Sequence, residues 1–137
     1  MLPHNHFLIA GLAIAPVSLA LFPEKSIGET AEWVVIGGVV SAAIDLDIVT
    51  LVWLKSRQEQ RLKPFRSLFE IYRRFKLFMD TITDTGVLKA GMITHFVVSV
   101  VAILVCRLLA PAYFVPVSIA VLSHILSDIP NMRRLSS

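Results

Sequence analysis

The sequence has a single cysteine, no G-x-S-x-G motif, and no lysine or arginine before its first apolar run. The one cysteine, Cys106, excludes an intrachain disulfide, and the missing motif argues against a serine nucleophile of the α/β-hydrolase type. Secretory signal peptides begin with a positively charged region, so the start MLPHNH argues against cleavage after Ser18-Leu19-Ala20. The first apolar run is therefore predicted to remain in the protein as a membrane span.

Apolar residues make up 55% of the 137 residues, and the mean hydropathy is +0.73. This composition is too apolar for an ordinary soluble domain and predicts an all-α integral membrane protein with one domain, residues 1–137. A transmembrane helix needs about 20 mainly apolar residues. Four runs approach or reach that length and predict four transmembrane helices, at about 7–22, 33–54, 92–110 and 112–129.

The segment between the second and third runs is rich in basic and aromatic residues. From Pro64 to Ile82, apolar residues recur every three or four positions and are flanked by arginine and lysine. This pattern predicts an amphipathic helix over about 64–82 that lies at the membrane surface; the alternative is a helix packed on the protein's own end. The aromatic face favours membrane lipids over nucleic acid as the partner.

The distribution of positive charge predicts the orientation. Nine of the thirteen lysines and arginines lie between Lys55 and Lys89, and Arg133 and Arg134 add two more. Because short cytoplasmic loops are enriched in these residues, we expect the 55–91 loop and both termini on the cytoplasmic side of the inner (cell) membrane. Four short spans enclose a polar site more easily as a homodimer, which we also expect.

The second run carries two carboxylates, Asp45 and Asp47, well inside its apolar sequence. A charged residue in hydrocarbon costs at least about 2.5–3.5 kcal/mol, so both need a partner, a cation or a water-filled cavity. With four spans, the polar residues of the other three runs fall in the same half of the membrane, so we expect one shared site. These residues are His6, with His4 less well placed, then His95, and finally His124 with Asp128.

Residue spacing adds geometry to this expectation. His124 and Asp128 are four positions apart and therefore share one face of a helix, where they can bind one ion. Asp45 and Asp47 are two positions apart, which separates their directions by about 200° on a regular helix. Both can face one site only if the helix ends or distorts near them, as irregular backbone does where it lines a cavity.

The residue types indicate a divalent metal. Histidine and aspartate without cysteine suit Zn²⁺ first, with Mn²⁺ and Fe as alternatives, whereas carboxylates alone suit Mg²⁺. Such an ion lowers the pKa of bound water and polarises a phosphoryl or acyl oxygen, which is the chemistry of hydrolysis. The serines of the apolar runs are expected to bond to backbone carbonyls; they are Ser41, Ser99, Ser123 and Ser127.

The order of these residues resembles the YdjM-like family of inner-membrane, metal-dependent hydrolases. That family, near the phospholipase C and P1 nuclease group, has a histidine in its first span and Pro-Asp-x-Asp at the end of its second. His-Arg-Gly-x-Thr-His starts the third span, and the last carries His-x-x-x-Asp. The matching segments here are His6, Ala42-Ala43-Ile44-Asp45-Leu46-Asp47, Thr94-His95 and Ser123-His124-Ile125-Leu126-Ser127-Asp128. The resemblance implies a metal-dependent hydrolase of phosphoesters or phospholipids.

The sequence departs from that family within these motifs. Ile44 stands in place of the proline, and Ala90 and Gly91 stand in place of the first histidine and the arginine. The missing histidine reduces the number of metal ligands, and the missing arginine removes a phosphate-binding group that Lys89 could replace in charge. The resemblance is therefore to a divergent member of the family.

Two functional interpretations follow. In the first, Asp45, Asp47 and His95 are catalytic, and the metal ligands are His6, Asp45, Asp47, His95, His124 and Asp128. In the second, the protein is not an enzyme: it is an ion or proton carrier, a lipid-binding structural module or a degenerate relative of the hydrolases, and the buried His and Asp serve that role.

Overall fold

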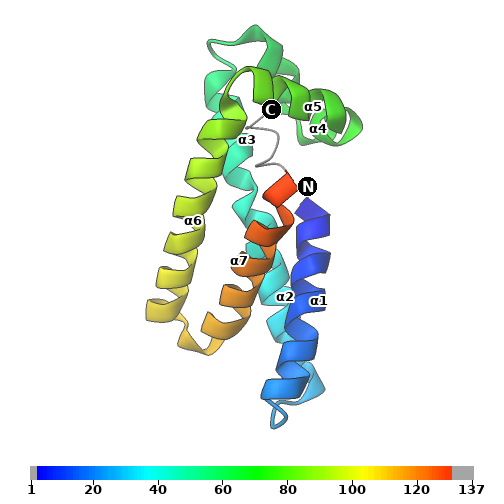
Figure 1. The fold of residues 1–137 in the computed structure, drawn as a ribbon, viewed down its shortest axis with the longest axis vertical. Helices are drawn as coiled ribbons and strands as arrows, with labels where there is room; N and C mark the ends of the chain where they lie inside the picture. Colours follow the sequence, from blue (N-terminus) through cyan, green and yellow to red (C-terminus); the bar gives the residue numbers. More distant parts are fainter. Residues whose placement is uncertain (1–2, 131–137) are drawn as a thin grey trace.

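The computed structural model describes residues 3–130 of the chain. Over this range every regular element is a helix and no strand is present, so the predicted all-α fold is confirmed there (Figure 1). The helices, in chain order, are α1 (Pro3–Leu21), α2 (Ile27–Ile44), α3 (Leu46–Lys55), η1 (Gln60–Arg66), α4 (Leu68–Arg73), α5 (Phe75–Asp84), α6 (Val87–Leu109), η2 (Pro111–Tyr113) and α7 (Phe114–Ser127).

Three of these helices are long and apolar enough to cross a membrane. They are α1 with 19 residues, α6 with 23, and the nearly continuous helix formed by α2 and α3 with 29. Backbone groups in hydrocarbon must be satisfied within their own segment, so helices are what such sequences form. The exposed side of α6 is a belt of large apolar side chains from Ile93 to Leu109, as expected for a lipid-facing surface.

The predicted fourth span, 112–129, is shorter in the structure. Pro111 lies in the η2 turn, the helix α7 begins only at Phe114, and its 14 residues extend about 21 Å. This is less than the roughly 30 Å of bilayer hydrocarbon. Four full spans are therefore not established. The predicted orientation stays a prediction, and Arg133 and Arg134, which contribute to it, lie outside the described residues.

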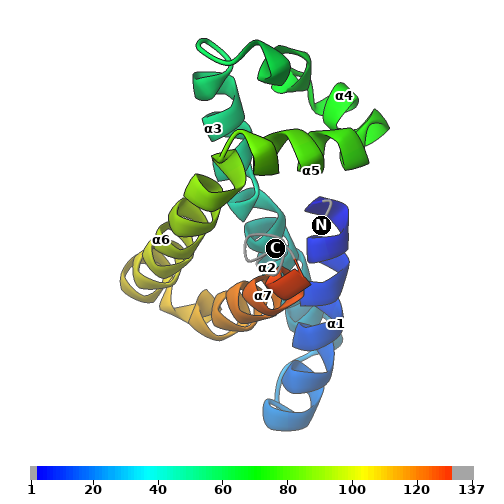
Figure 2. The ribbon, with the colours of Figure 1, turned by 45° about the horizontal axis from the view of Figure 1, so that its top comes forward.

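Helix α7 is the enclosed helix of the bundle. Figure 2 shows it between α6 and α1, and it packs on both α1 and α2. A close approach of these three helices is possible because position 37 is glycine: a Cβ there would clash with the Ile14 side chain and lie 3.2 Å from the Pro116 carbonyl oxygen. Small residues at such crossings are typical of membrane bundles.

The predicted single amphipathic helix over 64–82 is wrong. The chain is extended at Ser67 and leaves the helical region again at Arg74, so it forms the three short helices η1, α4 and α5. We call this segment, Gln60–Asp84, the cap. Pro64 lies inside η1 rather than at the start of an α-helix, because the chain folds back over the end of the bundle instead of lying flat.

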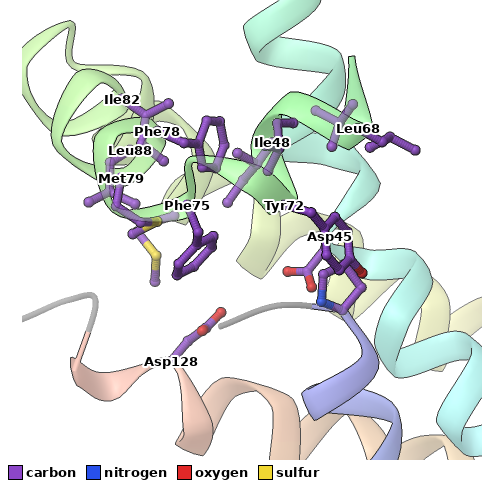
Figure 3. A pocket seen from close by; sticks show the side chains of 14 residues that line it. Asp45, Ile48, Leu68, Tyr72, Phe75, Phe78, Met79, Ile82, Leu88 and Asp128 are labelled. Atoms are coloured by element: carbon purple, nitrogen blue, oxygen red, sulfur yellow. The ribbon is translucent and has the colours of Figure 1, made fainter. Parts of the chain in front are cut away.

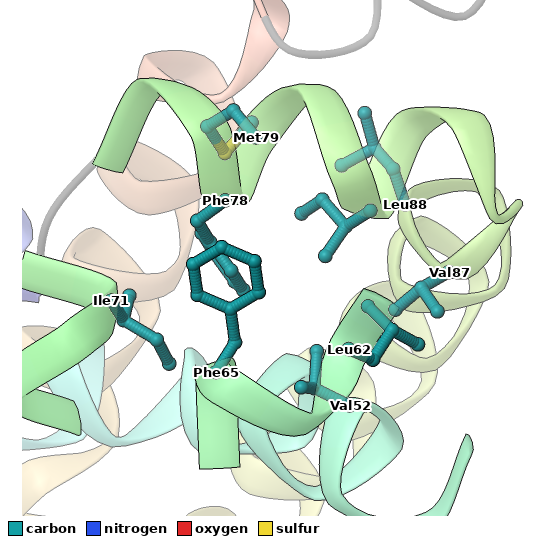
Figure 4. Close-up of a cluster of buried hydrophobic side chains, with 9 residues drawn as sticks. Val52, Leu62, Phe65, Ile71, Phe78, Met79, Val87 and Leu88 are labelled. Atoms are coloured by element: carbon teal, nitrogen blue, oxygen red, sulfur yellow. The ribbon is translucent and has the colours of Figure 1, made fainter. Parts of the chain in front are cut away.

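The apolar stripe of this segment is divided between two surroundings. Phe65, Phe78 and Ile82 are buried in a cluster with residues of α3 and α6, such as Val52 and Val87 (Figure 4). The two phenylalanine rings meet edge to face at a centroid distance of 5.3 Å. In contrast, Leu68 and Phe69 are 52% and 70% exposed. The first half of α4 thus keeps the exposed apolar character of an interfacial helix, and the rest packs on the protein itself.

Candidate metal centre

Two helix ends and one helix junction meet below the cap. In Figure 1 the last turn of α7 lies beside the first turn of α1, and the α2–α3 junction passes behind them. His6, Asp45, His124 and Asp128 each offer one ligand atom there, and these atoms lie within 4.8 Å of one another. The relative exposures of His6, His124 and Asp128 are 0%, 0% and 3%. The expectation of one shared polar site is thus met by a buried group that could hold a metal ion.

The helix that carries the two aspartates is interrupted between them. Helix α2 ends at Ile44 and α3 begins at Leu46, so Asp45 is both the C-terminal flanking residue of α2 and the N-terminal flanking residue of α3. The Val49 amide is 3.5 Å from the Asp45 carbonyl oxygen, so the backbone hydrogen bond across the junction is stretched. The predicted distortion is therefore present, and both carboxylates reach histidines of other helices.

The two carboxylates nevertheless have different neighbours. Asp45 belongs to the four-residue group, with its two oxygens 3.6 and 3.7 Å from the Nε2 atoms of His95 and His6. Asp47 lies against the outer side of His95, where its Oδ1 is 2.8 Å from Nδ1, and it accepts a hydrogen bond of 2.7 Å from the Thr94 hydroxyl. Asp47 thus contacts the imidazole of His95 rather than the group itself.

Three imidazoles present Nε2 to the same region. Those of His95 and His124 are each 3.5 Å from Asp128 Oδ2, and that of His6 is 3.6 Å from Asp128 Oδ1. The Nε2 atoms of His95 and His124 are only 2.6 Å apart. Two nitrogen lone pairs at this distance repel each other unless a proton or a cation lies between them. His95 therefore lies beside the group, and its predicted role as a metal ligand stays a prediction.

The outer nitrogen of each imidazole has a polar partner. The Ser127 hydroxyl donates to the His124 carbonyl at 2.8 Å, so at 2.9 Å it accepts the Nδ1–H of His6, whose Nε2 is then a bare lone pair. Ser41 Oγ is 3.3 Å from His124 Nδ1, and Asp47 holds His95. Histidines that ligate a metal are held in this way through their second nitrogen.

Sequence reasoning missed the contacts of Ser41 and Ser127 with imidazoles, since it expected these serines to bond to backbone, which Ser127 also does. Ser123 follows that expectation, with its hydroxyl on the Ala120 carbonyl, and Ser99 Oγ has no hydrogen-bond partner among the described residues. The spacing of Ser41 and Ser127 from the predicted site residues could have revealed their position. Ser41 precedes Asp45 by four positions and Ser127 follows His124 by three, so each shares a helix face with a member of the group.

Two buried atoms of the group have no hydrogen-bond partner in the part of the chain that the structure describes: His6 Nε2 and Asp45 Oδ2. Leaving such atoms unsatisfied costs about 1–3 kcal/mol each, and more for a charge. Within the same residues, the ion-pair partners of Asp45 and Asp47 are histidines, not lysine or arginine. A divalent cation would satisfy the lone pair of His6 and the carboxylate together, so the donor set fits a metal.

Two residues considered from sequence lie elsewhere. His4 is exposed, and its ring stacks on Tyr72 at a centroid distance of 5.9 Å instead of joining the group. Lys89 is exposed on α6 and is not among the described residues that line the cavity beside the group. It therefore does not occupy the place of a phosphate-binding arginine at this site.

An apolar cavity separates the group from the cap. Asp45 and Asp128 lie at one side of it, and the remaining wall is apolar or aromatic, with Phe75, Phe78 and Met79 of the cap opposite them (Figure 3). The cap thus shields the group from water, and this strengthens electrostatic interactions inside the site.

The fold and the site together define a small, all-helical, membrane-associated protein with a buried His/Asp group that could hold a metal ion. Comparisons with protein families, with curated proteins and with solved structures found no match. The assignment of a function therefore depends on the geometry of this site and on the motif resemblance.

Ser127→Ala tests the role of the serines. Loss of the hydroxyl frees the His6 imidazole to rotate, and changes to such partners typically weaken metal binding about 10–100-fold. We expect that loss for Ser127→Ala, measured by competition with a chromogenic zinc chelator. Ser123→Ala, which removes a hydroxyl bonded only to a backbone carbonyl, is the matched control and should bind zinc as the wild type does. Equal affinities for the two variants would contradict the role.

Proposed function

We propose that the protein is a membrane-embedded, metal-dependent hydrolase that acts on a phosphoester or phospholipid at the cytoplasmic leaflet. The observation that carries the proposal is the convergence of three Nε2 atoms on Asp45 and Asp128, each imidazole being held from behind. Partners on the second nitrogen orient histidines that bind a metal, so this arrangement supports a metal site.

His6, His124, Asp45 and Asp128 would hold the ion, with His95 beside them. Mixed nitrogen and carboxylate ligands without cysteine favour Zn²⁺ over Mn²⁺, Fe or Mg²⁺. A bound zinc ion supplies a water of lowered pKa and polarises the oxygen of the scissile bond. Asp47 keeps His95 in position through Nδ1.

The depth of the group supports a lipid substrate. The lipid-facing apolar belt of α6 begins at Ile93, two residues before His95, whereas the preceding turn carries the exposed Lys89. His95 therefore lies near one edge of the apolar belt, where the ester bonds of membrane lipids are found. The cap, with its exposed Leu68 and Phe69, is suited to contact the same surface.

The carrier interpretation has less support. Below the group, the three helices α1, α2 and α7 are packed by apolar clusters that include Ile14, Trp33, Ala120 and Val117. A transported ion needs polar groups along its path. The described residues supply such groups densely at one end of the bundle only, which favours a site of chemistry over a conduit.

The test is hydrolysis by the purified full chain in mixed micelles. We expect release of the phosphate-containing headgroup from a phospholipid, loss of this activity after treatment with a chelator, and recovery on adding Zn²⁺. Asp80→Asn, at an exposed position of the cap, should retain full activity. A zinc-loaded protein that releases no headgroup would reject the phosphoesterase. Zinc flux into liposomes that Asp47→Asn abolishes would establish the carrier in its place.

A further inference from the structure

The cavity beneath the cap is lined almost entirely by hydrocarbon. Its wall includes Ile48 of α3, Phe75, Phe78, Met79 and Ile82 of α5, and Leu88 of α6 (Figure 3). Of the described residues that line it, none is lysine or arginine, and the only charged side chains are Asp45 and Asp128. An apolar cavity with its polar groups gathered at one side is suited to a ligand with a hydrocarbon part and a polar end.

The basic side chains of the cap are directed to other partners. Arg66 donates to the Ser56 hydroxyl, and Arg73 and Arg74 both pair with Glu70 on the exposed side of α4. The positive charge of the segment therefore lies outside the cavity, where it can meet anionic headgroups. Among the described residues that line the cavity there is no cation for an anionic ligand, which favours an uncharged chain.

A second, smaller crevice reaches the same group from the lipid-facing side. It lies between α6 and α7 and is lined by Met92, His95, Phe96, Ile125 and Asp128. Phe96 is 64% exposed and belongs to the apolar belt of α6. Met92 and Asp128 line this crevice and the cap cavity alike. A molecule dissolved in the bilayer can thus approach the group from the side, without passing through water.

We propose that the cap cavity binds one hydrocarbon chain of a membrane lipid that enters between α6 and α7, with the lipid's polar linkage at the side of the cavity that Asp45 and Asp128 line. This inference deepens the proposed function by stating which part of a lipid substrate the cavity binds. It rests on that function only for the hydrolysis of the polar linkage. Chain binding itself requires the cavity and not the metal.

Photolabelling of the full-length protein in lipid nanodiscs tests the proposal. The probe is a phosphatidylcholine with a diazirine near the end of one acyl chain, and labelled residues are mapped by mass spectrometry. We expect label on Phe78, Met79 or Ile82, which are 5%, 6% and 0% exposed and which the surrounding bilayer does not contact. Label confined to lipid-facing residues such as Val101 would overturn the proposal.

Two variants of the same helix sharpen the result. Met79→Trp fills the cavity. It should weaken binding of the lipid chain about tenfold and lower the label on Ile82 by the same factor. Leu77→Trp adds the same side chain at a position that is 52% exposed and should leave the label unchanged. An equal effect of both variants would reject the cavity as the binding site.

A measurement on the wild type keeps the test independent of any variant's folding. A second probe carries the diazirine close to the glycerol linkage and should label Met92 or Ile125 instead of the cap. Identical labelling by the two probes would show that the chain is not held in one direction, against the proposal.

The outcome is also separable from that of the proposed function. Asp45→Asn should keep the buried label, because it leaves the apolar wall intact. Buried label without hydrolysis would leave a lipid-binding protein and reject the hydrolase. Hydrolysis of a short-chain ester without buried label would keep the hydrolase and reject the chain site.

Discussion

Replacing Asp45 by asparagine is expected to weaken Zn²⁺ binding by at least about 100-fold, the upper end of what the loss of an indirect partner causes. Asp45 lies at the helix break, with its two carboxylate oxygens near different histidines. Its Oδ2 atom has no hydrogen-bond partner among the described residues. The amide keeps the shape but loses the charge. Because one buried carboxylate is removed, the metal-free variant should be at least as stable as the metal-free wild type.

Elemental analysis after dialysis, followed by chelator competition, measures the effect. The matched control is Asp80→Asn, the same substitution on the exposed surface of α5, which should retain the zinc content of the wild type. Circular dichroism establishes that both variants keep their helices. Equal zinc binding by Asp45→Asn and the wild type, or a wild-type protein that binds no divalent metal, would exclude the proposed centre.

Gly37→Val is expected to destabilise the bundle by about 3 kcal/mol, the upper part of the range for overpacked cores. A side chain at this position meets the Ile14 side chain of α1, which is fully buried, and the Pro116 carbonyl of α7, a backbone group that cannot move without shifting its helix. Since α7 also carries His124 and Asp128, a displaced α7 misplaces two members of the metal group. Zinc affinity should therefore fall together with stability.

Unfolding in mixed micelles with increasing fractions of a denaturing detergent measures the stability. Gly28→Ala is the control, because its added Cβ would have the Ser26 hydroxyl at 3.8 Å as its nearest neighbour and no backbone in its way. Alanine favours a helix over glycine by about 1 kcal/mol, so this variant should be as stable as the wild type or slightly more so. A Gly37→Val protein as stable as Gly28→Ala would show that the three helices do not pack through this glycine.

Much of the fold could be anticipated because the bilayer leaves few choices. An apolar run without water must satisfy its backbone internally, so the helices around residues 7–22, 33–54 and 92–110 followed from length and composition. The break near Asp45 was also foreseeable, since two carboxylates that are two positions apart cannot share one face of a regular helix. These inferences use only local geometry and the properties of the solvent.

The cap could not be anticipated in the same way. Its three- and four-residue periodicity is compatible with one long helix at the membrane surface, and nothing local distinguishes that helix from the folded-back form. The breaks at Ser67 and Arg74 are decided by what Phe65 and Phe78 can bury against, namely Val52 of α3 and Val87 of α6. Tertiary packing of this kind overrides periodicity, because the buried area depends on distant segments.

The sequence by itself determined that this protein is helical and membrane-associated, and that its histidines and aspartates lie at one end of the bundle, because hydrophobic length and 1.5 Å per residue place them there. Only the tertiary structure decided which polar groups meet. It separated Asp45, in the metal group, from Asp47, behind His95, and it recruited Ser41 and Ser127 to hold two other imidazoles. Hydrogen-bond partners depend on ångström distances between helices, and side-chain packing alone sets those distances.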